Sequence, residues 1–161
     1  MIRPAKEEDL PELRRVYNAA RQYMIRSGNP DQWADGYPKQ EILDNDLALG
    51  DRLWVIEENG VIHGVFAFIL GADPTYFYIK GAWMNDLPYG TIHRIASDGQ
   101  LHGVFETALA FCKTKCKSIR IDTYKDNLTM QHLILKHGFT RCGIIYLENG
   151  SPRIAYQALF E

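Results

Sequence analysis

The sequence predicts an α/β (α+β) fold in a single domain, residues 1–161, with a mixed, mostly antiparallel twisted sheet and helices on both faces. Three observations predict this fold. Early hydrophobic segments are joined by hairpin signals, which favour antiparallel pairing. Helical and strand-like segments alternate in the last third, which favours a β-α-β crossover. The length suits one core, and we expect about six or seven strands.

The first third of the chain predicts one strand and two helices. Residues 2–5 form a short strand, and Asp9-Leu10-Pro11 begins a helix that Gly28 ends. Apolar residues recur in this helix at three- and four-residue spacing, which gives it one buried face: Leu10, Leu13, Val16, Tyr17, Ala20 and Met24. A polar and aromatic loop, residues 29–38, precedes a second helix over residues 39–49.

The middle of the chain predicts a hairpin. Residues 53–57 and 61–70 are strands, and Asn59-Gly60 between them is a strong turn signal because both positions tolerate positive φ. The signal is weaker afterwards, where residues 76–79 suggest a short strand and residues 83–89 a loop.

The last third predicts the alternating part of the fold. Its elements are, in order, a strand over residues 91–97, a turn over 98–103, a helix over 104–115, a strand over 118–124, a helix within 127–139, and strands over 142–147 and 153–160.

The composition excludes several classes of partner. Apolar residues make up 46% of the chain and charged residues 24%, with a formal net charge of -2. This balance does not favour nucleic acid or an anionic membrane. No apolar run approaches the roughly 18 residues that span a bilayer, and the N-terminus lacks a signal-peptide core. We therefore expect a cytoplasmic protein.

Three cysteines, an odd number without a secretion signal, argue against a disulfide framework. Cys112 and Cys116 share a helix face, and either His132 or His137 would complete a zinc site. Small cysteines on one helical turn are more often core residues. We predict no metal.

The turn before the helix at residue 104 is a candidate anion site. Gly99 and Gly103 flank a short turn that leads directly into the helix, whose free N–H groups and dipole favour an anion. Gln100 and His102 add side-chain donors. The alternative is an ordinary glycine-containing connection.

Two motifs carry a family resemblance. Gln100-Leu-His-Gly103-Val-Phe105 resembles Gln/Arg-x-x-Gly-x-Gly/Ala, the pyrophosphate-binding turn of the GNAT superfamily of N-acetyltransferases, although Phe105 replaces its second small residue. The turn is also shorter than usual. Phe105 is either a bulky side chain where the backbone should approach the ligand, or a residue that points into the core.

The second motif lies in the following helix. Asn127, Leu133, Gly138 and Phe139 match the family pattern Asn-x-x-Ala-x-x-Leu-Tyr-x-x-x-Gly-Phe. The residues also have structural interpretations, Asn127 as a helix cap and Gly-Phe as a helix stop and core anchor. Ile134 stands where many members have a tyrosine that protonates the departing CoA thiolate, and isoleucine cannot donate a proton.

The resemblance implies an N-acetyltransferase that moves an acetyl group directly from acetyl-CoA to a primary amine of a small molecule or peptide. The alternative is a non-catalytic CoA-binding or regulatory module of the same fold. A homodimer is compatible with the resemblance. A backbone N–H of residues 94–97 would polarise the thioester oxygen. The implied cofactor-binding residues are Ile95, Ala96, Ser97, Gln100, Leu101, His102, Gly103, Val104, Asn127 and Met130.

The candidate catalytic residues are Asp122, His93 and Tyr146. Strand alternation puts Arg120, Asp122 and Tyr124 on one face, where Asp122 is either solvated or ion-paired, or buried for a purpose. His93 is suited to proton transfer near pH 7, although a lone strand histidine is more often structural.

Aromatic residues in loops are candidates for the acceptor site. They would bind an amine by stacking or cation–π contact, or else form a small core beneath the loop. The candidate substrate-binding residues are Gln32, Trp33, Tyr37, Tyr76, Trp83 and Tyr124.

Overall fold

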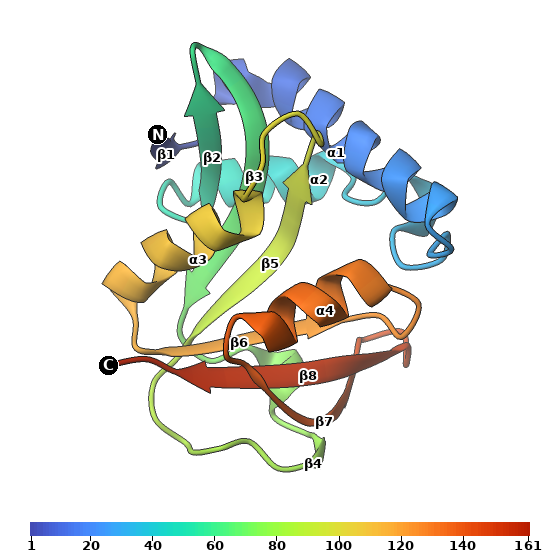
Figure 1. Ribbon diagram of the computed structural model, residues 1–161, viewed down its shortest axis with the longest axis vertical. Helices are drawn as coiled ribbons and strands as arrows, with labels where there is room; N and C mark the ends of the chain where they lie inside the picture. Colours follow the sequence, from blue (N-terminus) through green and yellow to red (C-terminus); the bar gives the residue numbers. More distant parts are fainter. The chain divides into compact units, whose positions relative to one another are not determined.

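A computed structural model describes all 161 residues. Figure 1 shows the order of its elements. They are β1 (Ile2–Pro4), η1 (Glu7–Asp9), α1 (Leu10–Arg26), η2 (Ala34–Gly36), α2 (Gln40–Ala48), β2 (Leu53–Glu58), β3 (Val61–Leu70), η3 (Pro74–Tyr76), β4 (Lys80–Gly81), β5 (Gly90–Ser97), α3 (Val104–Lys115), β6 (Ser118–Thr123), α4 (Leu128–Lys136), β7 (Thr140–Tyr146) and β8 (Pro152–Leu159).

The chain forms two compact units. Unit 1 comprises Met1–Phe68 and Arg94–Phe111, and unit 2 comprises Ile69–His93 and Cys112–Glu161. The predicted mixed α+β architecture is confirmed, with eight strands instead of about six or seven. The difference is small, because β4 has only two residues.

Unit 1 is built on the predicted hairpin. β1 pairs antiparallel with β2, and β2 pairs antiparallel with β3. Asn59 and Gly60 have φ of 53° and 80°. These positive values match a hairpin turn with the twist of its strands, and the prediction from the Asn-Gly pair is confirmed.

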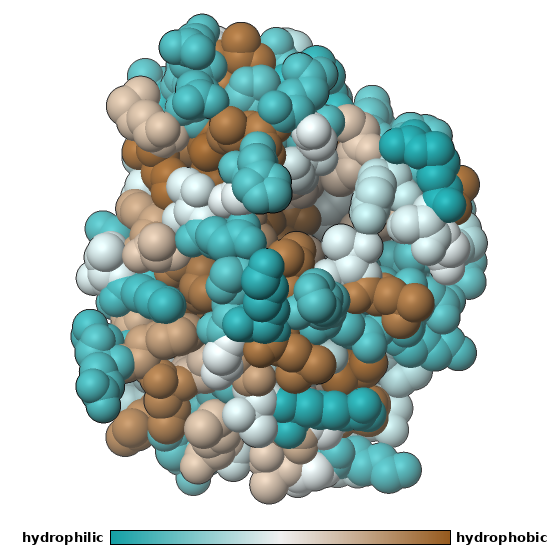
Figure 2. Space-filling model, viewed as in Figure 1, coloured by the Kyte–Doolittle hydropathy of each residue, from teal (hydrophilic) through white to brown (hydrophobic).

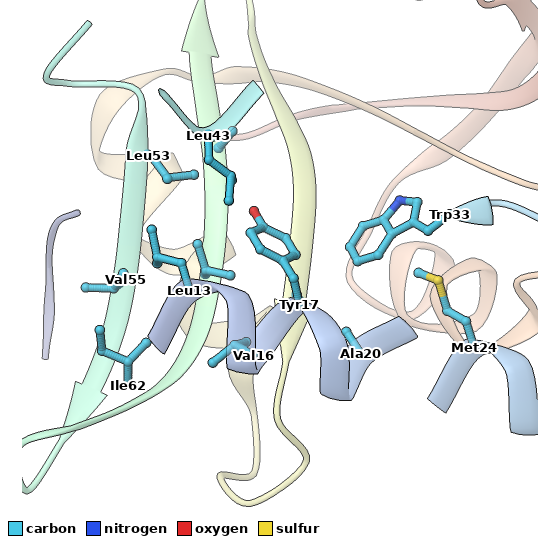
Figure 3. Packing of buried hydrophobic residues seen from close by; sticks show 13 residues of the cluster. Leu13, Val16, Tyr17, Ala20, Met24, Trp33, Leu43, Leu53, Val55 and Ile62 are labelled. Carbon is cyan, nitrogen blue, oxygen red and sulfur yellow. The ribbon is translucent and has the colours of Figure 1, made fainter. Parts of the chain in front are cut away.

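The two faces of β2 are covered by different helices. Leu53 and Val55 belong to the core cluster that contains the buried face of α1, and Figure 3 shows Leu13 and Tyr17 pointing from α1 toward the strands. Trp54, on the opposite face, packs on Phe111 of α3 with ring centroids 4.6 Å apart. In Figure 1 α3 lies in front of β2 and β3, with α1 and α2 behind them. Helices therefore cover both faces, as alternation along a buried strand requires.

Unit 2 carries the start of β5 and then, in hydrogen-bonded order, β6, β8, β7 and β4. β6 pairs antiparallel with β8 from Ser118 to Thr123. β5 pairs parallel with β6 at two positions, Gly90 with Ile119 and Thr91 with Arg120. The pairing ends there although both strands continue. Backbone pairing between β5 and β6 is thus limited to these two positions.

The strand expected at residues 76–79 is wrong. Pro74–Tyr76 is a 3₁₀ helix, and the nearest strand is β4 at Lys80–Gly81. Asp73 causes the difference, because its side chain accepts a hydrogen bond from the N–H of Thr75 at 2.9 Å and caps the turn. Pro74 fixes φ at the first helical position. The aromatic residues alone predicted a strand, but the hydrogen bond that caps the turn stabilises a 3₁₀ helix instead.

The helix of the second sequence motif has the expected ends. Asn127 caps α4, accepting a hydrogen bond from the N–H of Met130 at 3.0 Å. Gly138, with φ of 94°, follows the helix, and Phe139 is buried against Phe160. Ile134 has no exposed surface. The residues of this motif thus have structural roles as the N-cap of α4, as the end of the helix and as part of the core.

Figure 2 shows hydrophilic and hydrophobic residues interspersed on the visible face. No helix is both long and apolar enough to cross a membrane. All three cysteines are free, Cys112 is buried, and no group of three or more His, Cys, Asp or Glu side chains is arranged to hold a metal ion.

Candidate active site

The turn that precedes α3 presents backbone donors in unit 1. Gly99 and Gly103 have φ of 79° and 78°, the left-handed region that glycine adopts at little cost. The N–H of Gly99 donates to Ser97 Oγ, and the N–H of Gln100 donates to Asp98 Oδ1. The next N–H groups, of Leu101, His102 and Gly103, donate to no protein acceptor. Three successive donors at a helix start suit an anion.

The buried side chain of Asp98 stabilises this turn. Its side chain has no exposed surface and accepts hydrogen bonds from His63 Nδ1 at 2.8 Å and Arg15 Nη1 at 3.2 Å. Burial raises the pKa of Asp98, but the hydrogen bonds from Gln100, His63 and Arg15 outweigh burial and lower the pKa below its usual value. The carboxylate is therefore charged and holds the turn in one conformation.

Phe105 does not obstruct the turn. Only 4% of its surface is exposed, and it lies in the interior of unit 1. A glycine or alanine at this position would let a ligand approach the backbone of the turn. A phenylalanine whose side chain is buried in the core leaves the same space free.

Arg94, in β5, has an unusual backbone conformation. Its φ is 51°, uncommon for a residue with a side chain. Two contacts in unit 1 hold it: Tyr17 donates its hydroxyl to the Arg94 carbonyl at 3.0 Å, and the guanidinium contacts both oxygens of Asp46 at 2.9 and 2.7 Å. Such local strain persists only when the surroundings fix it, and it concentrates at functional sites.

Unit 2 contains a cluster of ionisable side chains centred on Tyr76. The Tyr76 hydroxyl donates to Asp122 Oδ2 at 2.6 Å. Burial and the charge of Asp122 raise the pKa of Tyr76 well above its ordinary value, so the hydroxyl keeps its proton. Asp122 is half-buried, and its second oxygen has no protein donor. That oxygen can accept a hydrogen bond from a ligand.

His93 lies beside the Tyr76 ring. The two ring centroids are 6.3 Å apart. His93 Nε2 is 2.9 Å from Asp73 Oδ2, and both side chains are about one-fifth exposed, at 21% and 18%. A histidine with a carboxylate partner, a buried tyrosine and a second carboxylate nearby can carry out proton transfer.

Arg120 supports the aromatic wall of this cluster. Its guanidinium lies over the ring of Trp83 at 4.0 Å and over the ring of Tyr89 at 3.9 Å. It also donates to the carbonyl of Asn85 at 2.9 Å. The Trp83 indole donates to the Tyr76 carbonyl at 3.0 Å. The loop at residues 83–89 is thereby fixed against β6, which confirms that Arg120 and Asp122 share a face.

Solved structures decide the family. A GNAT-family acetyltransferase from Streptococcus agalactiae is 34% identical to the chain, with a TM-score of 0.90, over 100% of this chain and 95% of that one. The chain belongs to the GNAT family of acyl-CoA-dependent N-acetyltransferases. A GNAT-family acetyltransferase from Listeria monocytogenes has the same fold at 20% identity, with a TM-score of 0.72 over 99% of this chain and 94% of that one. No protein-family model and no curated protein matches the sequence.

The remaining candidate residues of this acetyltransferase lie in different surroundings. Trp33 is buried in the core of unit 1, with ring centroids 5.6 Å from Tyr17 and 6.0 Å from Tyr37. Gln32 accepts a hydrogen bond from Asn29 at 2.8 Å. This arrangement matches the small core that the sequence left as the alternative for the loop at residues 29–38.

Tyr146 and Tyr124 each make a ring contact with another residue of unit 2. Tyr146 is 39% exposed and packs on Tyr78, with ring centroids 6.2 Å apart. The Tyr124 ring lies under Arg153, whose guanidinium is 4.7 Å from its centroid. The structure brings together His93, Asp122, Tyr76 and Trp83. The ring contacts of Tyr146 and Tyr124 are with Tyr78 and Arg153 instead.

Sequence reasoning missed Asp73 and Tyr89. Asp73 reads locally as the cap of a turn because Pro74 and Thr75 follow it, and it fills that role. Its second oxygen nevertheless contacts a histidine 20 positions later in the chain. Tyr89 accepts a hydrogen bond from the Asp73 N–H at 2.8 Å. These residues come together only in the folded chain, and no local sequence pattern predicts their contacts.

Proposed function

We propose that the protein transfers an acetyl group from acetyl-CoA directly to a primary amine of a small molecule or peptide. The observation that carries this proposal is the cluster in unit 2, where His93 has Asp73 as partner and Asp122 has Tyr76. A general base and a carboxylate for a cationic amine are the groups that such a transfer needs.

The turn before α3 fits the phosphates of the cofactor. The N–H groups of Leu101, His102 and Gly103 would hold the pyrophosphate, with the helix dipole adding to the attraction. The buried position of Phe105 supports the fit. The other proposed cofactor-binding residues are Ile95, Ala96, Ser97, Gln100 and Val104 in unit 1, and Asn127 and Met130 at the start of α4.

Acetyl-CoA supplies an acetyl group activated as a thioester. The amine nitrogen forms a bond to the acetyl carbon, the carbon–sulfur bond breaks with its electron pair leaving on sulfur, and the amine proton passes to His93. A thiol has an unperturbed pKa near 8.5, so the thiolate is a tolerable leaving group without an acid. The buried Ile134 is compatible with this chemistry.

The strained segment of β5 is proposed to stabilise the developing charge on the carbonyl oxygen. Arg94 departs from strand geometry and is fixed by Tyr17 and Asp46. We propose that a backbone N–H within residues 94–97 donates to that oxygen. Preorganised donors of this kind contribute about 10²- to 10³-fold to the rate.

Asp122 is proposed as the anchor of the acceptor. Its unpartnered oxygen can take a hydrogen bond from the ammonium group before the proton is lost. Trp83 and Tyr76 position this carboxylate and the loop around it. Tyr146, Tyr124, Gln32, Trp33 and Tyr37 remain predictions for roles at the site, and the contacts described above give them none.

Titration calorimetry with acetyl-CoA, followed by thiol release against a panel of primary amines, tests the proposal. We expect binding, and release with at least one amine. His93→Gln should lower turnover about 10²-fold or more, whereas Asp122→Asn should mainly raise KM for the amine. Glu148→Gln, at an exposed position of the same unit outside the loop at residues 83–89, is the matched control. Binding without release for any amine would contradict the transfer, and no binding at millimolar acetyl-CoA would contradict the cofactor.

A further inference from the structure

Asp73 is held from three directions in unit 2. Its Oδ1 accepts hydrogen bonds from the Thr75 N–H at 2.9 Å and the Thr75 hydroxyl at 2.7 Å. Its own N–H donates to the Tyr89 hydroxyl at 2.8 Å. Its Oδ2 is left to face His93 Nε2 at 2.9 Å. A turn cap needs only the first of these contacts, so the arrangement exceeds what capping η3 requires.

The charge of Asp73 decides how the proton is placed on the histidine. Burial raises the pKa of Asp73, but the hydrogen bonds from His93 and Thr75 outweigh burial and lower it to about 2. At neutral pH the carboxylate is ionised and can only accept hydrogen bonds. The proton between them therefore lies on Nε2 of His93, and in the neutral form of an imidazole with this tautomer the lone pair is on Nδ1.

The other groups around His93 are compatible with a base at Nδ1. Tyr76 faces the imidazole from η3, and its hydroxyl is engaged with Asp122 of β6. Tyr89 is engaged with the backbone of Asp73. Arg120, the cation of this face, lies over Trp83 and Tyr89. Each neighbour of the cluster thus has a partner of its own, and Asp73 alone is positioned to orient the ring.

We propose that Asp73 is a positioning residue that fixes the Nε2–H tautomer of His93, so that Nδ1 takes the proton of the acceptor amine. The role rests on the proposed function, because His93 is the base there. Asp73 acts through the histidine and need not touch the substrate. In catalytic triads a carboxylate acts on a histidine in the same physical way.

Nitrogen NMR of the histidine rings tests the tautomer without any substrate. The signals of His93 are assigned by their loss in His93→Gln. We expect the proton on Nε2 in the wild-type protein, and a shift toward the Nδ1–H form in Asp73→Asn. A wild-type ring with its proton on Nδ1 would overturn the inference, even if Asp73→Asn fails to fold.

Kinetics supply the second readout. In Asp73→Asn we expect kcat to fall about 10²- to 10³-fold with KM for acetyl-CoA changed less than about threefold, while Glu148→Gln stays at the wild-type rate. Asp73→Asn with wild-type kcat, in a protein that transfers acetyl groups, overturns the inference and leaves the proposed function standing. A wild-type protein without transferase activity contradicts the proposed function, and the tautomer measurement still decides the role of Asp73.

Discussion

The pair formed by Asp46 and Arg94 offers a direct test of how the strained part of β5 is held. Asp46→Ala removes both hydrogen bonds to the guanidinium, at 2.9 and 2.7 Å. Arg94 Nε is buried without an acceptor, so the variant leaves the guanidinium without any protein partner. Removing one member of a buried ion pair costs about 3–5 kcal/mol.

The exposure of the two side chains places the expected cost at the lower end of that range. Asp46 is 2% exposed, but Arg94 is 14% exposed, and water can reach part of its charge. We therefore expect the free energy of unfolding to fall by about 3 kcal/mol. For a chain of this length, that corresponds to a fall in Tm of about 6 to 12 °C.

Urea unfolding followed by circular dichroism gives the stability, and acetyl transfer at saturating amine gives kcat. Asp46→Leu with Arg94→Met in one chain is the matched control, since replacing both charges by apolar groups is often nearly neutral for stability. We expect kcat to fall in both variants, because both remove the contact that holds Arg94. A loss below about 1 kcal/mol in Asp46→Ala would refute the reasoning that the guanidinium depends on this carboxylate.

Three further predictions address the helix motif, the glycine turn and acid stability. Ile134→Tyr should destabilise the protein by about 1–3 kcal/mol and fail to raise turnover, because Ile134 has no exposed surface; higher turnover at unchanged Tm would show that the position is not a core position. Gly103→Ala should weaken acetyl-CoA binding in calorimetry, since φ of 78° is strained for alanine by about 1–2 kcal/mol; unchanged affinity would remove this turn from the cofactor site. Because the pKa of Asp73 is lowered, its contribution to the free energy of unfolding is present above about pH 4 and is lost as the pH falls toward about 2. In urea titrations, Asp73→Asn should therefore show a free energy of unfolding that varies less with pH between these values. The same pH dependence in the variant and the wild type would contradict the ionised carboxylate.

Much of the fold could be predicted because local rules and the tertiary structure agree. The Asn59-Gly60 turn, the Gly138 stop and the Asn127 cap each form where the residue type dictates. The segment after Gly71 departed from prediction. There one hydrogen bond, donated by the N–H of Thr75 to the Asp73 carboxylate, stabilises a 3₁₀ turn in place of a strand.

The candidate site was less predictable, because its contacts join distant segments. Alternation along β6 placed Arg120 and Asp122 on one face, and the structure confirms this. Alternation could not say that Asp122 would meet Tyr76 or that His93 would meet Asp73, since these partners lie 46 and 20 positions apart. In the aromatic loop at residues 29–38, the sequence suggested binding residues that the structure places in a core. Aromatic residues suit both roles, and Trp33 is buried.

The positions of the tryptophans give the protein a built-in optical probe. Trp33 is enclosed in the core of unit 1, and Trp54 packs on Phe111 in the same unit, whereas Trp83 alone belongs to unit 2. Its indole touches Arg120 and Tyr76, next to the proposed base and anchor. With Trp33 and Trp54 replaced by phenylalanine, the emission of Trp83 would report the arrival of an amine directly, in a chain without any label.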